Sequence, residues 1–172
     1  MREEMQRDLR TADEEAMDAA LAEAAQALAE GEIPVGAVLV HGGRIIARAH
    51  NRREALGDPT AHAELLCLRA GAAALGDWRL RDCTLYVTLE PCPMCAGAMG
   101  MSQLSRCVFG AADPEKGCCG SVYDLPADPA LHFATRWRAG VRAEESRALL
   151  AGFFDRLRRE RDASSSSEAQ PG

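Results

Sequence analysis

Two short motifs carry the residues of this chain that are best suited to chemistry. His62 and Glu64 form a His-x-Glu motif, and about thirty residues later Cys92 and Cys95 form a Cys-x-x-Cys motif preceded by Pro91. Imidazole and thiolate groups are preferred zinc ligands, and three protein ligands leave one tetrahedral position open to water. Water at such a position has its pKa lowered to near neutrality. The pattern therefore predicts a catalytic zinc site rather than a structural one.

Glu64 is left over once the three ligands are assigned. It could itself be a fourth ligand, because carboxylates also bind zinc. If it instead hydrogen bonds to the bound water, it can take a proton from that water and deliver it to another atom. Hydrolytic deamination needs this transfer, because hydroxide attacks an amidine-like ring carbon, a ring nitrogen is protonated and ammonia leaves. We therefore predict that Glu64 is the catalytic proton shuttle.

Each motif has a simpler explanation when it is taken alone. A single His-x-Glu arises by chance, and a single Cys-x-x-Cys can be a redox pair, a structural zinc site or neither. The two motifs together, in this order and each at an expected helix start, favour the catalytic interpretation. The adjacent Cys118 and Cys119 are not expected to add ligands, because neighbouring side chains diverge, and packing is the simpler role for them.

Hydrophobic periodicity, turn residues and helix-start signals predict the elements that hold these motifs. Gly42 and Gly43 should form the tight turn of an antiparallel hairpin. Asp58, with Pro59 and Thr60 after it, should supply the polar cap at the start of the next helix. Both halves of the metal motif fall at helix starts, where backbone N–H groups and the helix dipole lower the pKa of thiols. In chain order, we expect a helix over 11–30, strands over 35–41 and 44–50, a helix from about 58 to 75, a strand over 83–89, a helix from 90, strands over 106–110 and 135–139, and a closing helix over 142–161.

Strands that alternate with helices indicate an α/β fold, here a three-layer α/β/α sandwich with a central mixed five-stranded sheet. The chain has 172 residues, of which 47% are hydrophobic, so one domain over 11–161 is the expectation. Residues 1–10 are strongly charged, and residues 162–172 are serine-rich without bulky apolar side chains. Both ends are therefore expected to be disordered.

Charge and cysteine usage limit the classes of partner and compartment. The formal net charge of −6 argues against general attraction to nucleic acid. Lys116 is the only lysine, and arginine is suited to phosphates and bases, although a codon preference explains this equally well. The net charge thus neither supports nor excludes an RNA substrate. No secretory leader, disulfide framework or membrane-length apolar run is seen, so we expect a cytoplasmic protein with free thiols and no membrane contact.

Five segments resemble the zinc-dependent cytidine deaminase superfamily and, within it, the tRNA-specific adenosine deaminases. The similarity extends from about residue 15 to residue 158, which is nearly all of the expected domain. The segments are 32–38 (E-I-P-V-G-A-V), 51–52 (N-R), 58–64 (D-P-T-A-H-A-E), 85–92 (L-Y-V-T-L-E-P-C) and 94–98 (M-C-A-G-A).

The resemblance implies a cytidine deaminase-like fold and conversion of the wobble adenosine, position 34 of tRNA, to inosine. His62, Cys92 and Cys95 would bind one Zn²⁺ per subunit, and Glu64 would be the proton shuttle. The implied partners are the anticodon loop of a tRNA, in particular an arginine tRNA, and a second copy of the chain in a homodimer.

Two further residues match family positions that contact the substrate. Asn51 matches an asparagine that contacts the extruded adenosine, and Asp113 falls where the family places residues beside the flipped nucleotide. The simpler explanations are an asparagine that closes a turn and an aspartate in an ordinary loop. The chain also departs from the family, because Leu131-His132-Phe133 stands where relatives commonly carry Leu-Asn-His. His132 or Phe133 could instead stack on a base.

Two other functions remain open at this point. A deaminase of free bases or nucleosides, such as guanine or cytosine, would use the same zinc chemistry on a small molecule. A noncatalytic zinc module that binds RNA or a partner would need a fourth protein ligand to close the site. The size of the accepted substrate distinguishes the first function from tRNA deamination. Replacement of Glu64 distinguishes the second, because a noncatalytic module has no turnover to lose.

Overall fold

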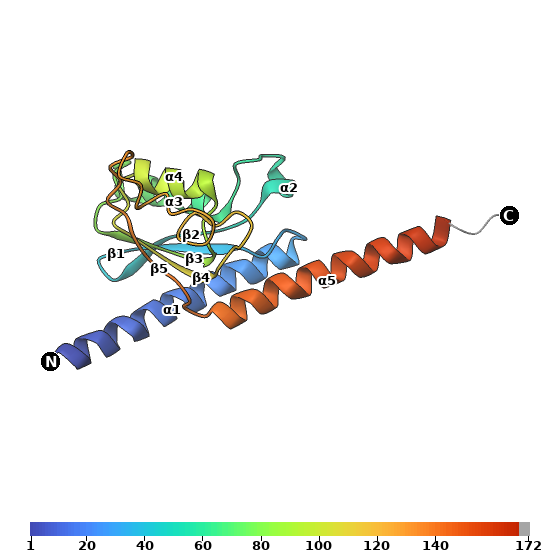
Figure 1. Cartoon of the computed structure of the whole chain (residues 1–172), viewed down its shortest axis with the longest axis horizontal. Coiled ribbons are helices and arrows are strands. Elements are labelled where there is room, and N and C mark those ends of the chain that lie inside the picture. Colours follow the sequence, from blue (N-terminus) through green and yellow to red (C-terminus); the bar gives the residue numbers. More distant parts are fainter. Residues whose placement is uncertain (169–172) are drawn as a thin grey trace.

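The computed structural model describes residues 1–168 and forms one α/β unit. A central sheet carries helices on both faces (Figure 1). In chain order, the elements are α1 (Arg2–Ala29), β1 (Gly36–His41), β2 (Arg44–His50), α2 (Arg53–Leu56), α3 (Ala63–Leu75), β3 (Cys83–Leu89), α4 (Pro93–Met101), β4 (Arg106–Ala111), β5 (Arg136–Arg138) and α5 (Ala143–Glu168).

The sheet has the strand order β2-β1-β3-β4-β5. β1 is antiparallel to β2 and β3, whereas β3, β4 and β5 are parallel to one another. Gly42 and Gly43 join β1 to β2 with φ values of 55° and 73°, the positive angles that a tight hairpin turn requires. α1 and α5 cover one face, and α3 and α4 cover the other (Figure 1). The predicted three-layer sandwich with a mixed five-stranded sheet is confirmed.

The core is split between the two faces because strand side chains alternate in direction. Val38, Tyr86 and Val108 point towards α1, where Met17 and Ala20 are fully buried. Their neighbours along the same strands point towards α3 and α4. This second cluster is the larger one and includes Leu39, Cys67, Leu85, Val87, Met99, Cys107 and Phe109. The helices that carry the metal motif are therefore seated on the larger part of the core.

α1 is tied to three strands by one buried carboxylate, that of Asp13. Its oxygens accept hydrogen bonds from the Tyr86 hydroxyl at 2.8 Å, from both terminal nitrogens of Arg106 at 2.8 and 2.7 Å, and from Arg138 at 2.6 Å. Burial raises the pKa of Asp13, but the hydrogen bonds from Arg106 and Tyr86 and the nearby positive charges outweigh it and hold the pKa below its usual value. These partners come from β3, β4 and β5, so Asp13 fixes where α1 crosses the sheet.

α1 also crosses β1 at a point where only glycine fits. A Cβ atom on Gly36 would lie 2.1 Å from the carbonyl oxygen of Ala20 and 2.3 Å from the backbone nitrogen of Ala24. Gly36→Ala is therefore expected to lower the free energy of unfolding by about 2 kcal/mol, because a packed helix must move away from the sheet. Urea denaturation would measure this loss.

Gly152→Ala is the matched control for that measurement. A Cβ atom there meets nothing within 4 Å, and alanine is the better helix former, so α5 should gain slightly in stability. An unchanged denaturation midpoint for Gly36→Ala would contradict the close approach of α1 and β1.

The two terminal helices are longer than the sequence predicts. α1 begins at Arg2 and α5 continues to Glu168, so helix extends through segments expected to be disordered, 1–10 and most of 162–172. Extending an existing helix costs much less than nucleating one, which explains why residues without a core-facing pattern can continue it. The last part of the expected tail, 169–172, lies outside the described residues. The limits of the deaminase domain, 11–161, stay a prediction.

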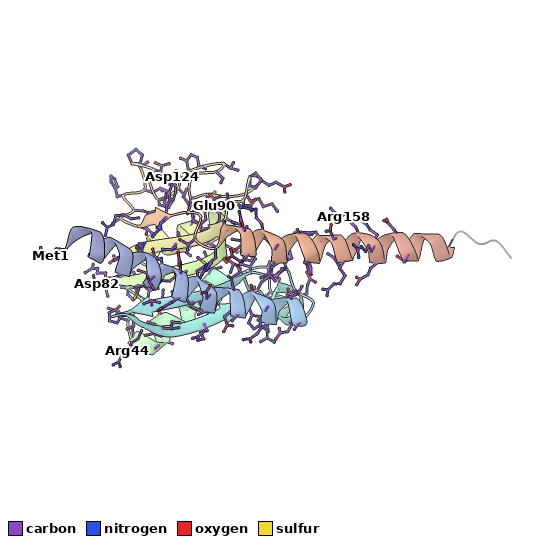
Figure 2. The ribbon with its side chains drawn as sticks, turned by 90° about the horizontal axis from the view of Figure 1, so that it is seen from below. Met1, Arg44, Asp82, Glu90, Asp124 and Arg158 are labelled. Carbon is purple, nitrogen blue, oxygen red and sulfur yellow. The ribbon has the colours of Figure 1, made fainter. Side chains whose placement is uncertain are left out.

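α5 projects well beyond the sheet, and Arg158 lies on its projecting part (Figures 1 and 2). Of its apolar stripe, Phe153 is buried, whereas Phe154 and Leu157 are 43% and 42% exposed. The stripe therefore packs only in the first half of the helix. None of the helices within residues 1–168 has the length and hydrophobicity that crossing a bilayer demands.

Candidate metal centre and active site

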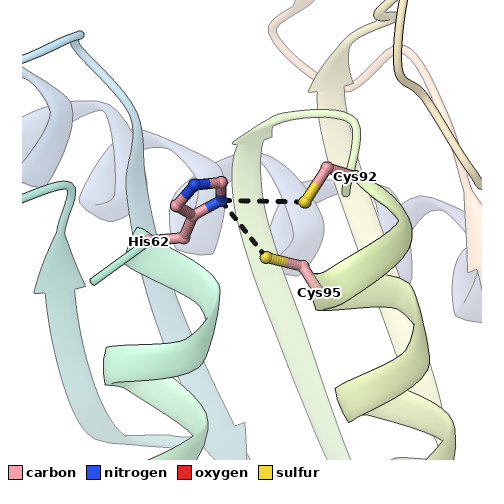
Figure 3. A group of neighbouring side chains, drawn as sticks. All are labelled: His62, Cys92 and Cys95. Carbon is pink, nitrogen blue, oxygen red and sulfur yellow. Dashed lines mark hydrogen bonds between the residues drawn. The ribbon is translucent and has the colours of Figure 1, made fainter. Parts of the chain in front are cut away.

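The two metal motifs meet on one side of the sheet, at the N-termini of α3 and α4. His62 is the N-cap residue of α3, Cys92 is the N-cap residue of α4, and Cys95 lies in the first turn of α4. His62 Nδ1 lies 3.7 Å from Cys92 Sγ and 3.5 Å from Cys95 Sγ (Figure 3). Among the described residues, this is the only cluster of three side chains with ligand atoms within 4.8 Å of one another. The three predicted ligands are thus brought together.

The local backbone explains why these side chains are available. His62 and Cys92 both have extended backbone angles, as N-cap residues do, and neither side chain caps its own helix. Both helices begin later than predicted, at Ala63 and at Pro93. Asp58, expected to cap α3, instead accepts hydrogen bonds from the backbone and hydroxyl of Thr60 at 2.8 and 2.7 Å. The turn before α3 is therefore closed by Asp58, and His62 remains free to bind a ligand.

Hydrogen bonds among the three ligand side chains shift the pKa of each of them. Hydrogen bonds from Cys95 and His62 lower the pKa of Cys92 to about 4, although burial opposes the shift. The same bond raises the pKa of Cys95, as does burial, and the hydrogen bond to Cys92 raises the pKa of His62. A site that already stabilises a thiolate suits a cation, and metal binding displaces the remaining protons. The donor set of one imidazole and two thiols fits zinc.

Glu64 lies beside the ligands rather than among them. It sits in the first turn of α3 and is only 4% exposed, and burial raises its pKa to about 7. It does not belong to the 4.8 Å ligand cluster. A buried carboxyl group next to the ligand cluster suits proton transfer better than a fourth-ligand role. The assignment of Glu64 as proton shuttle stays a prediction.

Asn51 is held close to His62 by the backbone. The Arg52 amide donates to the carbonyl oxygen of Ala61 at 3.1 Å, which places the residues next to Asn51 and His62 side by side. Asn51 is buried, and its Nδ2 donates to Glu32 Oε2 at 3.1 Å. It also lines a cavity of about 280 Å³ together with Glu32, Ile33, Phe154 and Leu157. This position is compatible with substrate contact, which stays a prediction.

Asp113 lines a cavity next to the one that Asn51 lines. This second cavity, of about 520 Å³, shares Ile33 and Phe154 with the first, so the two cavities adjoin. Asp113 Oδ1 accepts backbone hydrogen bonds from Glu115 and Lys116 at 2.9 and 3.1 Å, which is the loop role considered as the simpler explanation. Contact between Asp113 and a substrate stays a prediction.

Glu90 organises the loop that carries Asp113, and sequence reasoning missed it. Its carboxylate is 2% exposed, and Oε1 accepts the backbone N–H groups of Cys119 and Ser121, each at 3.0 Å. Oε2 accepts the Asp113 N–H at 2.9 Å and the Ser121 hydroxyl. Figure 2 labels this residue within the body of the protein. Its place in the family-like segment 85–92, between an apolar strand and Pro91, was the available signal, and that signal does not distinguish a buried carboxylate from an exposed one.

Four further residues from the sequence analysis lie outside the ligand cluster. Cys118 and Cys119 are buried and do not join the ligand cluster, in agreement with a packing role. At the departure from the family pattern, His132 is exposed, whereas Phe133 packs over Gly100 near the C-terminal end of α4. Along the helix, Gly100 lies about 12 Å from Cys92 and about 7.5 Å from Cys95, so Phe133 packs beyond the turn that carries the ligands.

Comparisons with known proteins agree with this geometry. Residues 10–111 match the family model for the cytidine and deoxycytidylate deaminase zinc-binding region. The tRNA-specific adenosine deaminase of Bacillus subtilis (strain 168) is 48% identical over 153 residues, 89% of this chain and 95% of that protein. A solved structure from a study of A-to-I editing by tRNA:A34 deaminases matches with a TM-score of 0.77 and 43% identity, over 79% of this chain and 99% of that one.

A guanine deaminase from Nitrosomonas europaea is also similar in structure, with a TM-score of 0.67 and 27% identity over 81% of this chain and 83% of that one. The family model, the high identity over nearly full length and the His-Cys-Cys cluster all agree. The chain therefore belongs to the cytidine and deoxycytidylate deaminase family and, within it, to the tRNA-specific adenosine deaminases.

Proposed function

We propose that this protein deaminates the wobble adenosine of tRNA to inosine by hydrolysis. The observation that carries the proposal is the cluster of His62, Cys92 and Cys95 with the buried Glu64 beside it. Water adds its oxygen to C6 of adenine, the C6–N bond breaks, and ammonia leaves. The near-complete match to tRNA-specific adenosine deaminases supports a tRNA substrate.

The chain's own groups have distinct tasks in this reaction. Zinc held by His62, Cys92 and Cys95 would supply a Lewis acid that lowers the pKa of water. The Glu64 carboxylate accepts a proton from the attacking water and passes it to N1 of the ring. It then takes the second proton of that water from the new C6 hydroxyl and passes it to the amino group, which leaves as ammonia. Asn51 offers an amide with both donor and acceptor groups to the extruded nucleoside.

The direct test is an inosine assay with the zinc-loaded full chain. An arginine tRNA transcript with adenosine at position 34 should gain inosine there, detected by reverse transcription as an A-to-G change. The same transcript with guanosine at position 34 is the matched control. Absence of inosine from the first transcript would overturn the proposal.

The structural match to a guanine deaminase favours a free-base deaminase as the second candidate. That enzyme would release ammonia from guanine or cytosine and none from tRNA. Assaying ammonia release with free bases and with tRNA in parallel distinguishes the two functions.

We also propose a cytoplasmic homodimer that acts on arginine tRNA. An apolar surface between α3 and α4 supports the pairing of two copies. Trp78 and Met101 are 54% and 70% exposed, and Trp78 borders a cavity of about 240 Å³ with Leu65 and Leu68. Light scattering of the purified full chain measures the number of subunits, and a monomer would contradict the homodimer.

A further inference from the structure

Glu32 is a buried carboxylate with both oxygens committed to the segment that carries Asn51. It lies in the loop between α1 and β1 and is 2% exposed. Oε2 accepts a hydrogen bond from Asn51 Nδ2 at 3.1 Å, and Oε1 accepts one from the backbone N–H of Ala55 at 2.8 Å. The Glu32 backbone N–H donates in turn to Ala27 at the end of α1, at 2.9 Å. Glu32 is therefore held by its side chain to the Asn51 segment and by its backbone to α1.

The chemistry of the pair determines which way the Asn51 amide faces. An asparagine amide can turn by about 180° at little cost, which exchanges its donor and acceptor positions. An ionised carboxylate only accepts hydrogen bonds, so it selects the orientation in which Nδ2 faces Glu32. The second N–H and the carbonyl oxygen of Asn51 then keep one arrangement. Both residues line the same cavity of about 280 Å³, so this arrangement is set at the cavity wall.

We propose that Glu32 is a positioning residue that fixes the polarity of the Asn51 amide presented to the substrate. The inference rests on the proposed function, because it assigns Asn51 to the nucleoside site. Glu32 does not touch the reacting atoms. It acts through Asn51, and orientation in advance spares the substrate the cost of selecting one of two amide orientations.

Glu32→Gln tests this polarity with almost no change in shape. The new carbonyl must still accept the Ala55 N–H, so its NH₂ group faces Asn51, and the Asn51 amide has to turn its oxygen towards it. We expect kcat/KM for the tRNA to fall by about tenfold or more, the effect of misdirecting one buried hydrogen-bonding group. Glu15→Gln is the matched control. Glu15 is an exposed glutamate of α1, which covers the face of the sheet opposite the metal site, so its replacement should leave activity unchanged.

Two double variants distinguish control of the Asn51 amide orientation from a merely structural role of Glu32. In an Asn51→Ala background, Glu32→Gln should cause no further loss, because its path to the substrate is gone. In Glu32→Gln combined with Asn51→Asp, the Gln NH₂ group can again donate to its partner, so stability should recover. Activity should stay low, because a carboxylate at position 51 still offers the wrong groups. Recovery of activity, or additive losses in the first pair, would overturn the proposal.

One measurement on the unaltered protein does not depend on how the variants fold. The Asn51 side-chain N–H that points to Glu32 should be protected from exchange with water in NMR spectra, and a rapidly exchanging pair of protons would contradict the inference. If the unaltered protein forms no inosine, the proposed function fails, whereas this protection still reports on the amide. If it forms inosine and Glu32→Gln is as active, only the positioning role fails.

Discussion

Replacing Glu64 with alanine is expected to abolish turnover while the zinc content stays that of the unaltered protein. The carboxyl group is buried beside the ligand cluster but does not belong to it, so its removal takes away the proton carrier and leaves the metal ligands in place. Proton transfer by a positioned side chain contributes up to about 10⁴-fold in rate, and we expect a loss of at least about 10³-fold. Single-turnover inosine formation and metal analysis of the same sample measure both quantities.

Glu15→Ala is the control for this experiment. Glu15 is an exposed glutamate of α1, on the face of the sheet opposite the metal site, and its replacement should leave both zinc content and turnover unchanged. Loss of zinc from Glu64→Ala would identify Glu64 as a fourth ligand and would favour the noncatalytic module. Unchanged turnover would remove Glu64 from the chemistry altogether.

The second large effect concerns stability. Asp13→Asn should lower the free energy of unfolding at neutral pH by about 3 kcal/mol, because it removes the charge that holds Arg106 and Arg138 and turns an amide NH₂ group towards them. Thermal or urea unfolding measures the change. Asp18→Asn is the matched control on the same helix. That aspartate is half exposed and pairs with Arg142, and such a surface pair should contribute less than about 1 kcal/mol.

The pH dependence of this effect has a definite sign. The pKa of Asp13 lies below its ordinary value of 3.8 in the folded protein. A lowered pKa means that the stabilisation is complete above the unfolded-state value and is lost as the pH falls through the lower folded-state value. The difference between the unaltered protein and Asp13→Asn should therefore be constant from pH 7 to about pH 5 and shrink below about pH 4. A difference that grew on acidification would contradict the ion-pair explanation.

The fold could be predicted from the sequence largely because its local signals agree with one another. Gly42 and Gly43 supply a turn that no other interpretation explains as well, and the apolar runs beside them have strand periodicity. The terminal helices were predicted too short, because residue pattern reports burial, whereas helix extension depends on cooperativity with the turn before it. Asp58 was assigned to the wrong structure, because an aspartate that closes a turn and one that caps a helix look alike in sequence.

The metal cluster could be predicted because its residue types and spacing are constrained by coordination chemistry. Glu32 and Glu90 could not, since a glutamate in a sequence is ordinarily expected at the surface. Each is buried only because backbone N–H groups from distant segments converge on it. Such convergence is a property of tertiary structure, and the residues next to each glutamate in the sequence do not indicate it.

Hydrogen bonds fix the length of the short connection between β3 and α4. Glu90 accepts four hydrogen bonds from one loop, the Pro91 carbonyl accepts the Cys118 N–H at 2.9 Å, and Cys92 starts the helix. An extra residue here would break this register and move Cys92 Sγ away from the His62 imidazole. Insertions and deletions should consequently be purged at this junction during divergence of related sequences. Length variation is free to accumulate instead at residues 126–132, the part of the irregular stretch before β5 that supplies none of these hydrogen bonds and none of the metal ligands.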